Sequence, residues 1–228
     1  MSLRRIVPVL LAGLLLTSGC RGGSGPGADP ATALKTAQHT LEGTSGVSLS
    51  LRTDDLPDGV QGLKSASGTV TDAPAYDGNL GVVTQLGSFS VPVKAVDGKV
   101  YAQIPLSPGW SEVDPADYGA PDPAQLISAA SGVPSILAAT EKPRNGKDVR
   151  GGTDNKEVLS TITGTVPDSA VSAIIPGASG DFDATYALTS EDELREMALT
   201  GVFYAGAEPN TYTVGFEDYG TTQDITAP

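Results

Sequence analysis

The chain has 228 residues, enough for one domain with a sizeable core, and its 27 acidic against 14 basic residues give a net charge of −13. This excess of acid argues against a nucleic-acid-binding surface and against attraction to an anionic membrane through overall charge. One histidine and one cysteine are too few for a His/Cys zinc cluster or an internal disulfide.

The first 19 residues have the layout of a secretory signal peptide. Two arginines precede an apolar run over 6–16, which is shorter than the roughly 20 residues of a membrane-spanning helix. Cys20 follows a glycine, an arrangement that resembles the lipobox of bacterial lipoproteins, although Thr17 stands where an aliphatic residue is usual. We predict that 1–19 is a cleaved signal peptide and that Cys20 is the lipid anchor. The alternative is an ordinary secreted protein.

Residues 20–28 read CRGGSGPGA, a composition typical of a flexible tether. Its coil dimension is on the order of 15 Å, so the globular part is expected to stay close to the membrane surface. The remainder, 29–228, is predicted to form a single domain because no second linker divides it.

A helix is predicted to begin at Asp29-Pro30, a capping residue followed by proline, and to end at Gly43. Beyond it, apolar and polar residues alternate with a period of two, which indicates strands. The strands predicted in the first half are 47–51, 66–71, 76–84, 89–96 and 99–106. Asp97-Gly98 predicts a tight hairpin between the last two. Short strands joined by short turns indicate an antiparallel meander.

The second half opens with turn-forming residues, since prolines and glycines dominate 105–123. The run 124–140 has a helical composition, but Gly132 and Pro134 split it into two short pieces. The remaining predicted elements are a short helix over 168–176 and strands over 158–166, 185–189, 194–203 and 211–216. The segment 190–193 fits either a helix-capping box or a hairpin turn. We choose the turn because both flanking segments are strand-like.

The order and spacing of several passages resemble the mycobacterial LppX/LprAFG lipoproteins. The passages are AYDGNLGVV (75–83), VDGKVYAQI (96–104), GWSEV (109–113), DPAQLI (122–127), TITGTVP (161–167) and the closing stretch 212–228. The likeness covers nearly the whole chain after the tether. It implies an α+β fold, in which helices pack on the concave face of a curved antiparallel β-sheet (a half-barrel) and enclose a hydrophobic cavity.

The resemblance also implies a function. It implies a membrane-anchored lipoprotein that binds acylated lipids or glycolipids in the cavity and carries them from the plasma membrane toward the outer envelope. The implied partners are a long-chain acylated lipid or glycolipid, the plasma membrane through the N-terminal acyl anchor and, as a further candidate, a membrane transporter. The expected location is the cell membrane, lipid-anchored on the extracytoplasmic face. We expect no enzymatic activity, no cofactor, no metal and no nucleic acid.

Strand parity predicts which side chains would line the cavity. One apolar face of 79–84, 89–95 and 99–104 is expected to lie opposite the short helices of the second half. The predicted lining residues are Leu80, Val82, Phe89, Val91, Val93, Val100, Ala102, Ile104, Leu126, Ile127, Ile136, Leu137 and Ile174. From the residues alone, the same side chains can equally pack a solid core, so the cavity rests on the resemblance.

Two other functions stay open. One is a non-carrier interaction lipoprotein with a solid core, serving a transporter or a sensor at the cell surface. The other is an esterase or glycosidase with two carboxylates. Its support is poor, because His39 lies on the first predicted helix and no acidic pair forms a recognisable motif. The pairs Asp54-Asp55 and Glu217-Asp218 also lack the spacing of a calcium-binding EF-hand loop.

Overall fold

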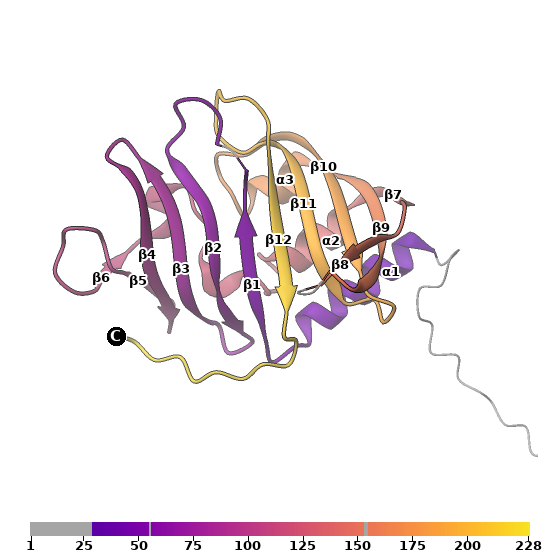
Figure 1. Ribbon diagram of the computed structural model, residues 1–228, viewed down its shortest axis with the longest axis horizontal. Helices are drawn as coiled ribbons and strands as arrows, with labels where there is room; N and C mark the ends of the chain where they lie inside the picture. The colour runs from indigo at the N-terminus through magenta and orange to yellow at the C-terminus, as the bar shows by residue number, and fades with distance from the viewer. Residues whose placement is uncertain (1–28, 55, 153–154) are drawn as a thin grey trace, which may run out of the picture.

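The computed structural model describes residues 29–54, 56–152 and 155–228. The predicted signal peptide, the anchor Cys20 and the tether 20–28 lie outside the described residues, as does Asp55. Within the described part, the chain forms one large antiparallel sheet with short helices on one face (Figure 1).

The strands of the sheet are β1 (Gly46–Arg52), β2 (Gly62–Thr71), β3 (Ala75–Thr84), β4 (Gly87–Val96), β5 (Lys99–Ala102), β6 (Ser111–Val113), β7 (Glu141–Asn145), β8 (Val149–Gly151), β9 (Glu157–Val166), β10 (Ser179–Leu188), β11 (Leu194–Val202) and β12 (Asn210–Glu217). The helices are α1 (Pro30–Glu42), α2 (Val133–Ala139) and α3 (Asp168–Ser172), with 3₁₀ turns η1 (Pro115–Tyr118) and η2 (Pro123–Gln125).

The strand order is β6-β5-β4-β3-β2-β1-β12-β11-β10-β9-β7, and β8 pairs separately with β9. Two meanders thus meet at the centre, where β1 pairs antiparallel with β12. The sheet does not close into a barrel, because β6 and β7 lie at opposite edges. It is the half-barrel that the family resemblance implied. Among the described residues, no helix has the length and apolar character needed to cross a membrane.

Local signals in the sequence correctly located several elements. The Asp29 carboxylate caps α1 by accepting a hydrogen bond from the Thr32 backbone N–H at 2.9 Å, and the hydrogen bonds from Thr32 lower the pKa of Asp29. Asp97 and Gly98 take φ values of 55° and 71°, as a tight hairpin between β4 and β5 requires. The contested segment 190–193 is the turn between β10 and β11, closed by a hydrogen bond from Thr189 N–H to the Glu193 carbonyl.

Several predicted boundaries were wrong. The strand predicted over 99–106 ends at Ala102, before the turn-forming residues that begin with Pro105. The helix predicted over 168–176 ends at Ser172, and the first helical piece of 124–140 is only the 3₁₀ turn η2. Strands β6, β7 and β8 were not predicted at all. β6 lies within the stretch 105–123 that was read as turns, and EKPRN and VRG show no apolar alternation.

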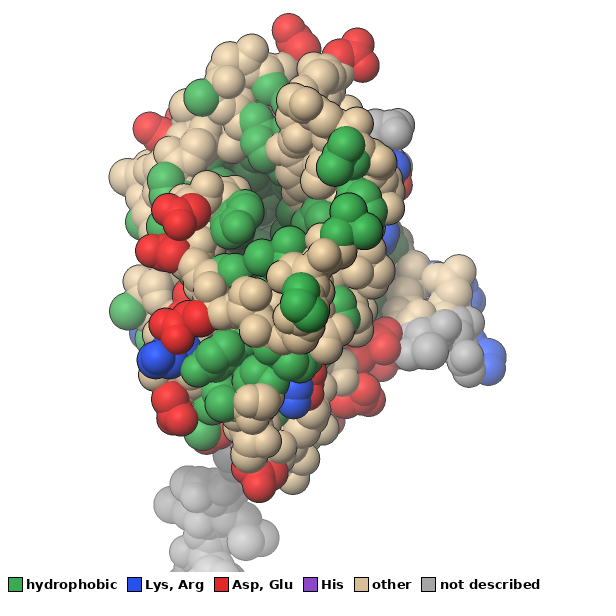
Figure 2. Space-filling model, turned by 90° about the vertical axis from the view of Figure 1, so that its left-hand side faces the viewer, with side chains coloured by type: hydrophobic (Ala, Val, Ile, Leu, Met, Phe, Trp, Pro, Cys, Tyr) green, Lys and Arg blue, Asp and Glu red, His purple; other side chains and the backbone are tan. Residues whose placement is uncertain are grey.

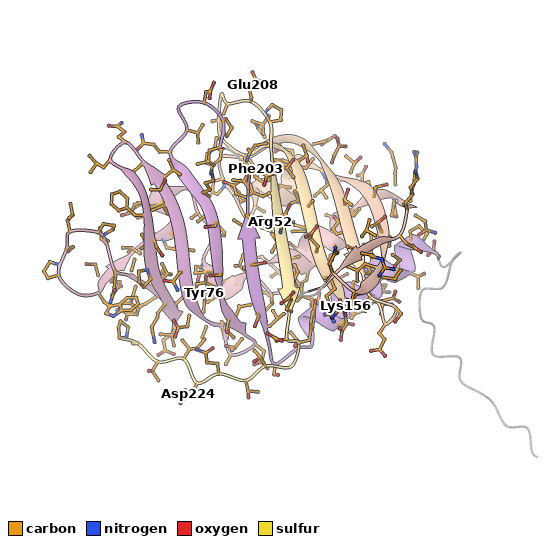
Figure 3. All side chains as sticks on the ribbon, viewed as in Figure 1. Arg52, Tyr76, Lys156, Phe203, Glu208 and Asp224 are labelled. Atoms are coloured by element: carbon orange, nitrogen blue, oxygen red, sulfur yellow. The ribbon has the colours of Figure 1, made fainter. Side chains whose placement is uncertain are left out.

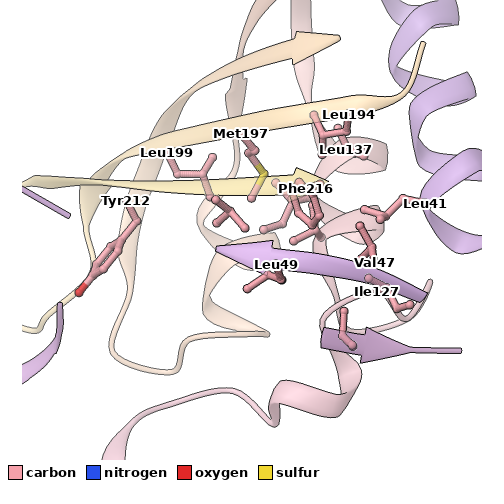
Figure 4. Packing of buried hydrophobic residues seen from close by; sticks show 14 of the residues in the cluster. Leu41, Val47, Leu49, Ile127, Leu137, Leu194, Met197, Leu199, Tyr212 and Phe216 are labelled. Atoms are coloured by element: carbon pink, nitrogen blue, oxygen red, sulfur yellow. The ribbon is translucent and has the colours of Figure 1, made fainter. Parts of the chain in front are cut away.

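The core fills the space between the central strands and the helices. Leu41 of α1 and Leu137 of α2 lie against side chains from β1, β11 and β12 (Figure 4). The labelled strand residues in that view are Val47, Leu49, Leu194, Met197, Leu199, Tyr212 and Phe216. All of them are buried, so this half of the molecule has a densely covered interior.

Candidate functional site

At one end of the strands, the inward-facing side chains are fully covered. The register places Val47, Val70, Tyr76 and Ala95 side by side across β1 to β4. At most 1% of the surface of any of these residues is exposed. Protein atoms therefore pack directly beneath this row of the sheet.

At the other end of the same strands, most inward-facing side chains are only half-buried. Leu51, Ala66 and Leu80 form the equivalent row across β1 to β3, and Val82 pairs with Phe89 one step further along β3 and β4. Val91 of β4, which pairs with Leu80, is still buried, with 9% of its surface exposed. Protein atoms therefore cover this end of the inner face less completely than the packed end.

The helices explain the difference between the two ends. α2 contacts both α1 and α3, α1 lies against β7 and β11, and α3 lies against β10. β2, β3 and β4 are instead contacted by the 3₁₀ turn η2. Figure 2 views the molecule from the β6 edge and shows hydrophobic side chains around a hollow that opens on this side. The term hollow is used below for this space.

Two glycines on the inner face of the sheet leave room for the ring of Tyr76. Gly68 and Gly78 face each other across β2 and β3, and the ring of Tyr76 lies over both of them. A Cβ atom on Gly68 would come within 2.8 Å of that ring, so a larger residue would displace it. The Tyr76 hydroxyl donates a hydrogen bond to the Ser67 carbonyl at 3.1 Å, and burial raises the pKa of Tyr76 to about 12. Figure 3 shows Tyr76 on this part of the sheet.

The buried tyrosines of the other half are neutral and hydrogen-bonded as well. Tyr212 donates to the Leu63 carbonyl and lies 2.7 Å from the Tyr204 hydroxyl, while Tyr186 meets Thr140 at 2.6 Å. Burial raises the pKa of both Tyr212 and Tyr186. The phenol groups therefore place no charge inside the sheet at neutral pH.

Twelve of the thirteen predicted lining residues join a single hydrophobic cluster. Seven are buried within it and five pack against it while half-buried. The half-buried five are Leu80, Val82, Phe89, Leu126 and Ile174. Ile104 differs, because it lies beyond the end of β5 and is 39% exposed. Whether any of these side chains touches a ligand stays a prediction.

Sequence reasoning missed much of the interior surface. The prediction included no cavity residue from β1, β10, β11 or β12, although Leu51, Phe182 and Phe203 belong to or pack against the same cluster. The signal was present in DFDAT (181–185), where an apolar residue alternates with polar ones. The expected strand began too late, at residue 185, to include it.

Catalytic groups do not converge in the part of the chain that the structure describes. No group of three or more His, Cys, Asp or Glu side chains lies close enough together there to hold a metal ion. The side chain of His39 is 62% exposed on α1 and lies 3.4 Å from its neighbour Glu42.

A comparison with family models identifies the chain. The model of the LppX_LprAFG lipoprotein family matches residues 29–226. The chain belongs to this family. Among solved structures, it is similar to LprF from Mycobacterium bovis, with a TM-score of 0.71 and 15% identity over 91% of this chain and 99% of that one. It is also similar to the lipoprotein LppX from Mycobacterium tuberculosis.

For LppX, the TM-score is 0.63 and the identity 18%, over 86% of this chain and 97% of that one. At these identities the two structures establish a shared fold, and both span nearly the full length of this family member. A search of curated protein sequences found no match.

Proposed function

We propose that this family member is a lipid-anchored envelope protein that holds the acyl chains of a lipid or glycolipid in the hollow and carries them from the plasma membrane toward the outer envelope. The observation that supports it most is the change in burial along β1 to β3, from fully covered to half-covered inward side chains. A folded domain gains stability by covering such aliphatic surface, so an acyl chain is its natural complement.

Transfer free energies show that a lipid carrier needs no catalysed reaction. Transfer of an acyl chain into water costs about 0.8 kcal/mol per CH₂ group, or roughly 12 kcal/mol for a chain of about 16 carbons. An apolar lining such as Leu80, Val82 and Phe89 replaces most of the lost hydrocarbon contacts. The protein would thereby lower the barrier to leaving the membrane, with neither a nucleophile nor a cofactor.

Two uncharged loops flank the open end of the hollow. Leu86, at the tip of the β3–β4 hairpin, is 82% exposed, and Leu106, in the loop between β5 and β6, is 96% exposed. Ile104 lies in the same loop as Leu106. Segments 85–88 and 103–110 contain no charged residue. Exposed aliphatic side chains at a rim offer an acyl chain its first contacts on the way in.

A matched pair of tryptophan variants tests the proposal. Val82 and Val70 both face inward, but Val82 lies at the half-covered end and Val70 at the packed end. Val82→Trp is expected to leave thermal stability nearly unchanged and to lower the amount of copurifying lipid. Val70→Trp is expected to destabilise the fold by about 1–3 kcal/mol, because it overpacks a filled core.

Thermal melts and native mass spectrometry of each variant and of the wild type provide the two readouts. The proposal fails if Val82→Trp destabilises as strongly as Val70→Trp and the wild type carries no lipid. That result would favour the non-carrier interaction lipoprotein, whose interior is solid.

A further inference from the structure

Basic residues are concentrated in one part of this acidic molecule. Residues 141–151, here called the basic hairpin, comprise β7, β8 and the segment that connects them, and both strands pair with β9. The basic hairpin holds four of the 11 Lys and Arg residues of 29–228, with two acidic residues. The rest of 29–228 has seven basic and 25 acidic residues. The overall charge therefore hides a strong local contrast.

Four basic side chains of the hairpin are exposed and form no ion pair with a described carboxylate. Lys142, Arg144, Lys147 and Arg150 are all exposed, and among the described residues no ion pair involves any of them. Most basic residues elsewhere are paired with acids. The paired residues are Arg52, Lys94, Lys99 and Arg195. The hairpin thus keeps positive charge available for an external partner.

Part of the hairpin borders a shallow polar groove on the outside of the sheet. Lys142 and Arg144 line it together with hydroxyl groups from β9 and β10. The hydroxyl residues are Thr163, Thr165 and Thr185, and one carboxylate, Asp183, lies among them. A β-bulge between Glu141 and Arg144 interrupts the pairing of β7 with β9, and Lys142 takes a φ of 48° there. Ammonium, guanidinium and hydroxyl donors suit phosphate oxygens.

The position of the hairpin indicates which partner it meets. α1 lies against β7, and Figure 1 shows that α1 begins beside this edge of the sheet. From Cys20 to Asp29 the chain can span at most about 30 Å. The β6 edge lies ten strand spacings away, or about 48 Å along the sheet. An anchor at Cys20 would therefore keep the β7 edge within reach of the bilayer.

We propose that the basic hairpin is a docking surface for the anionic phospholipid head groups of the membrane that holds the chain. This inference rests on the anchor at Cys20 in the proposed function, but not on lipid in the hollow. At about 0.1 M salt the Debye length is about 10 Å, so the hairpin feels the membrane surface while the distant acidic residues are largely screened. The net negative charge of the whole protein therefore does not describe the charge at the β7 edge.

The test uses residues 20–228 with Cys20→Ser, so that no acyl chain contributes to binding. Cosedimentation is measured with vesicles of phosphatidylcholine, with and without about one-third phosphatidylglycerol. Each basic residue near an anionic surface contributes about fivefold to binding. Lys142→Gln with Arg144→Gln is therefore expected to weaken binding to the anionic vesicles more than tenfold, and Lys147→Gln with Arg150→Gln similarly.

The matched control is Lys64→Gln with Lys99→Gln, which removes the same charge from the other half of the sheet and should change binding little. Size-exclusion chromatography verifies that each variant stays monomeric, since Lys142 and Arg144 also protect the edge strand β7 from pairing with another chain. All hairpin variants should retain wild-type amounts of lipid in the hollow, which separates this proposal from the carrier function.

Three results would overturn the proposal. The first is a lack of wild-type binding to anionic vesicles at about 0.1 M salt. The second is equal weakening by the hairpin and control variants. The third is complete displacement by inorganic phosphate at matched ionic strength, which would assign the groove to a soluble phosphate compound instead.

Discussion

Cys20→Ala is expected to move the protein from the membrane fraction to the soluble fraction. The acyl groups predicted on this cysteine supply about 0.8 kcal/mol per buried CH₂, far more than a few surface charges can. Cell membranes are washed at low and at high salt, and the protein is followed by immunoblot. Ser24→Ala, a change within the same tether, is the control and should leave the distribution unchanged.

The washes at low and at high salt distinguish the acyl anchor from the basic hairpin. A fraction of Cys20→Ala that stays bound at low salt and leaves at high salt is what the basic hairpin would produce. A fraction that remains bound after the high-salt wash would mean that the anchor lies elsewhere in the chain.

Phe182→Ala is expected to destabilise the domain by about 3–5 kcal/mol. The Phe182 residue is fully buried, and its ring centroid lies 4.9 Å from that of Phe203, which in turn meets Tyr212 edge-on at 4.9 Å. The ring also covers Gly201, where a Cβ atom would lie 2.3 Å from it. Truncation would leave a cavity between β10 and the end of β11.

Urea denaturation monitored by circular dichroism measures this loss. Phe182→Leu keeps most of the volume and should cost less than about 1.5 kcal/mol. Tyr118→Ala removes an aromatic ring that is 70% exposed and should stay within about 0.5 kcal/mol of the wild type. A loss below about 1 kcal/mol for Phe182→Ala would show that the aromatic cluster does not brace this part of the fold.

Elements whose conformation is determined by a few neighbouring residues could be predicted from the sequence. The cap at Asp29, the turn at Asp97-Gly98 and the alternation over 76–84 each follow from a few neighbouring residues. Strands β7 and β8 have no such cause, because their conformation comes from pairing with the outer strand β9. The alternative of a helix after Ser190 was dismissed correctly only because its flanks were considered together.

The faces of the site were predictable, but their packing density was not. Parity places Val70, Leu80 and Val82 on the inner side of the sheet. Whether atoms lie beneath each one depends on η2 and the helices, which are distant in sequence. The local charge was equally hard to predict, because the net charge is summed over the whole chain. Only the fold shows that Lys142 and Arg144 lie exposed at one edge of the sheet.

The pairing of β1 with β12 has a consequence for folding. Leu49 lies opposite Phe216, so the first strand of the sheet finds one of its two neighbours only when the last strand is available. A chain delivered from its N-terminus must keep the apolar face of β1 incompletely covered until then, and such non-local pairing is slow. Each meander can form early from local hairpins, but the pairing of β1 with β12 that joins the two meanders forms late. The interval between these steps is the period of greatest exposure to aggregation and proteolysis, and holdase chaperones would act within it.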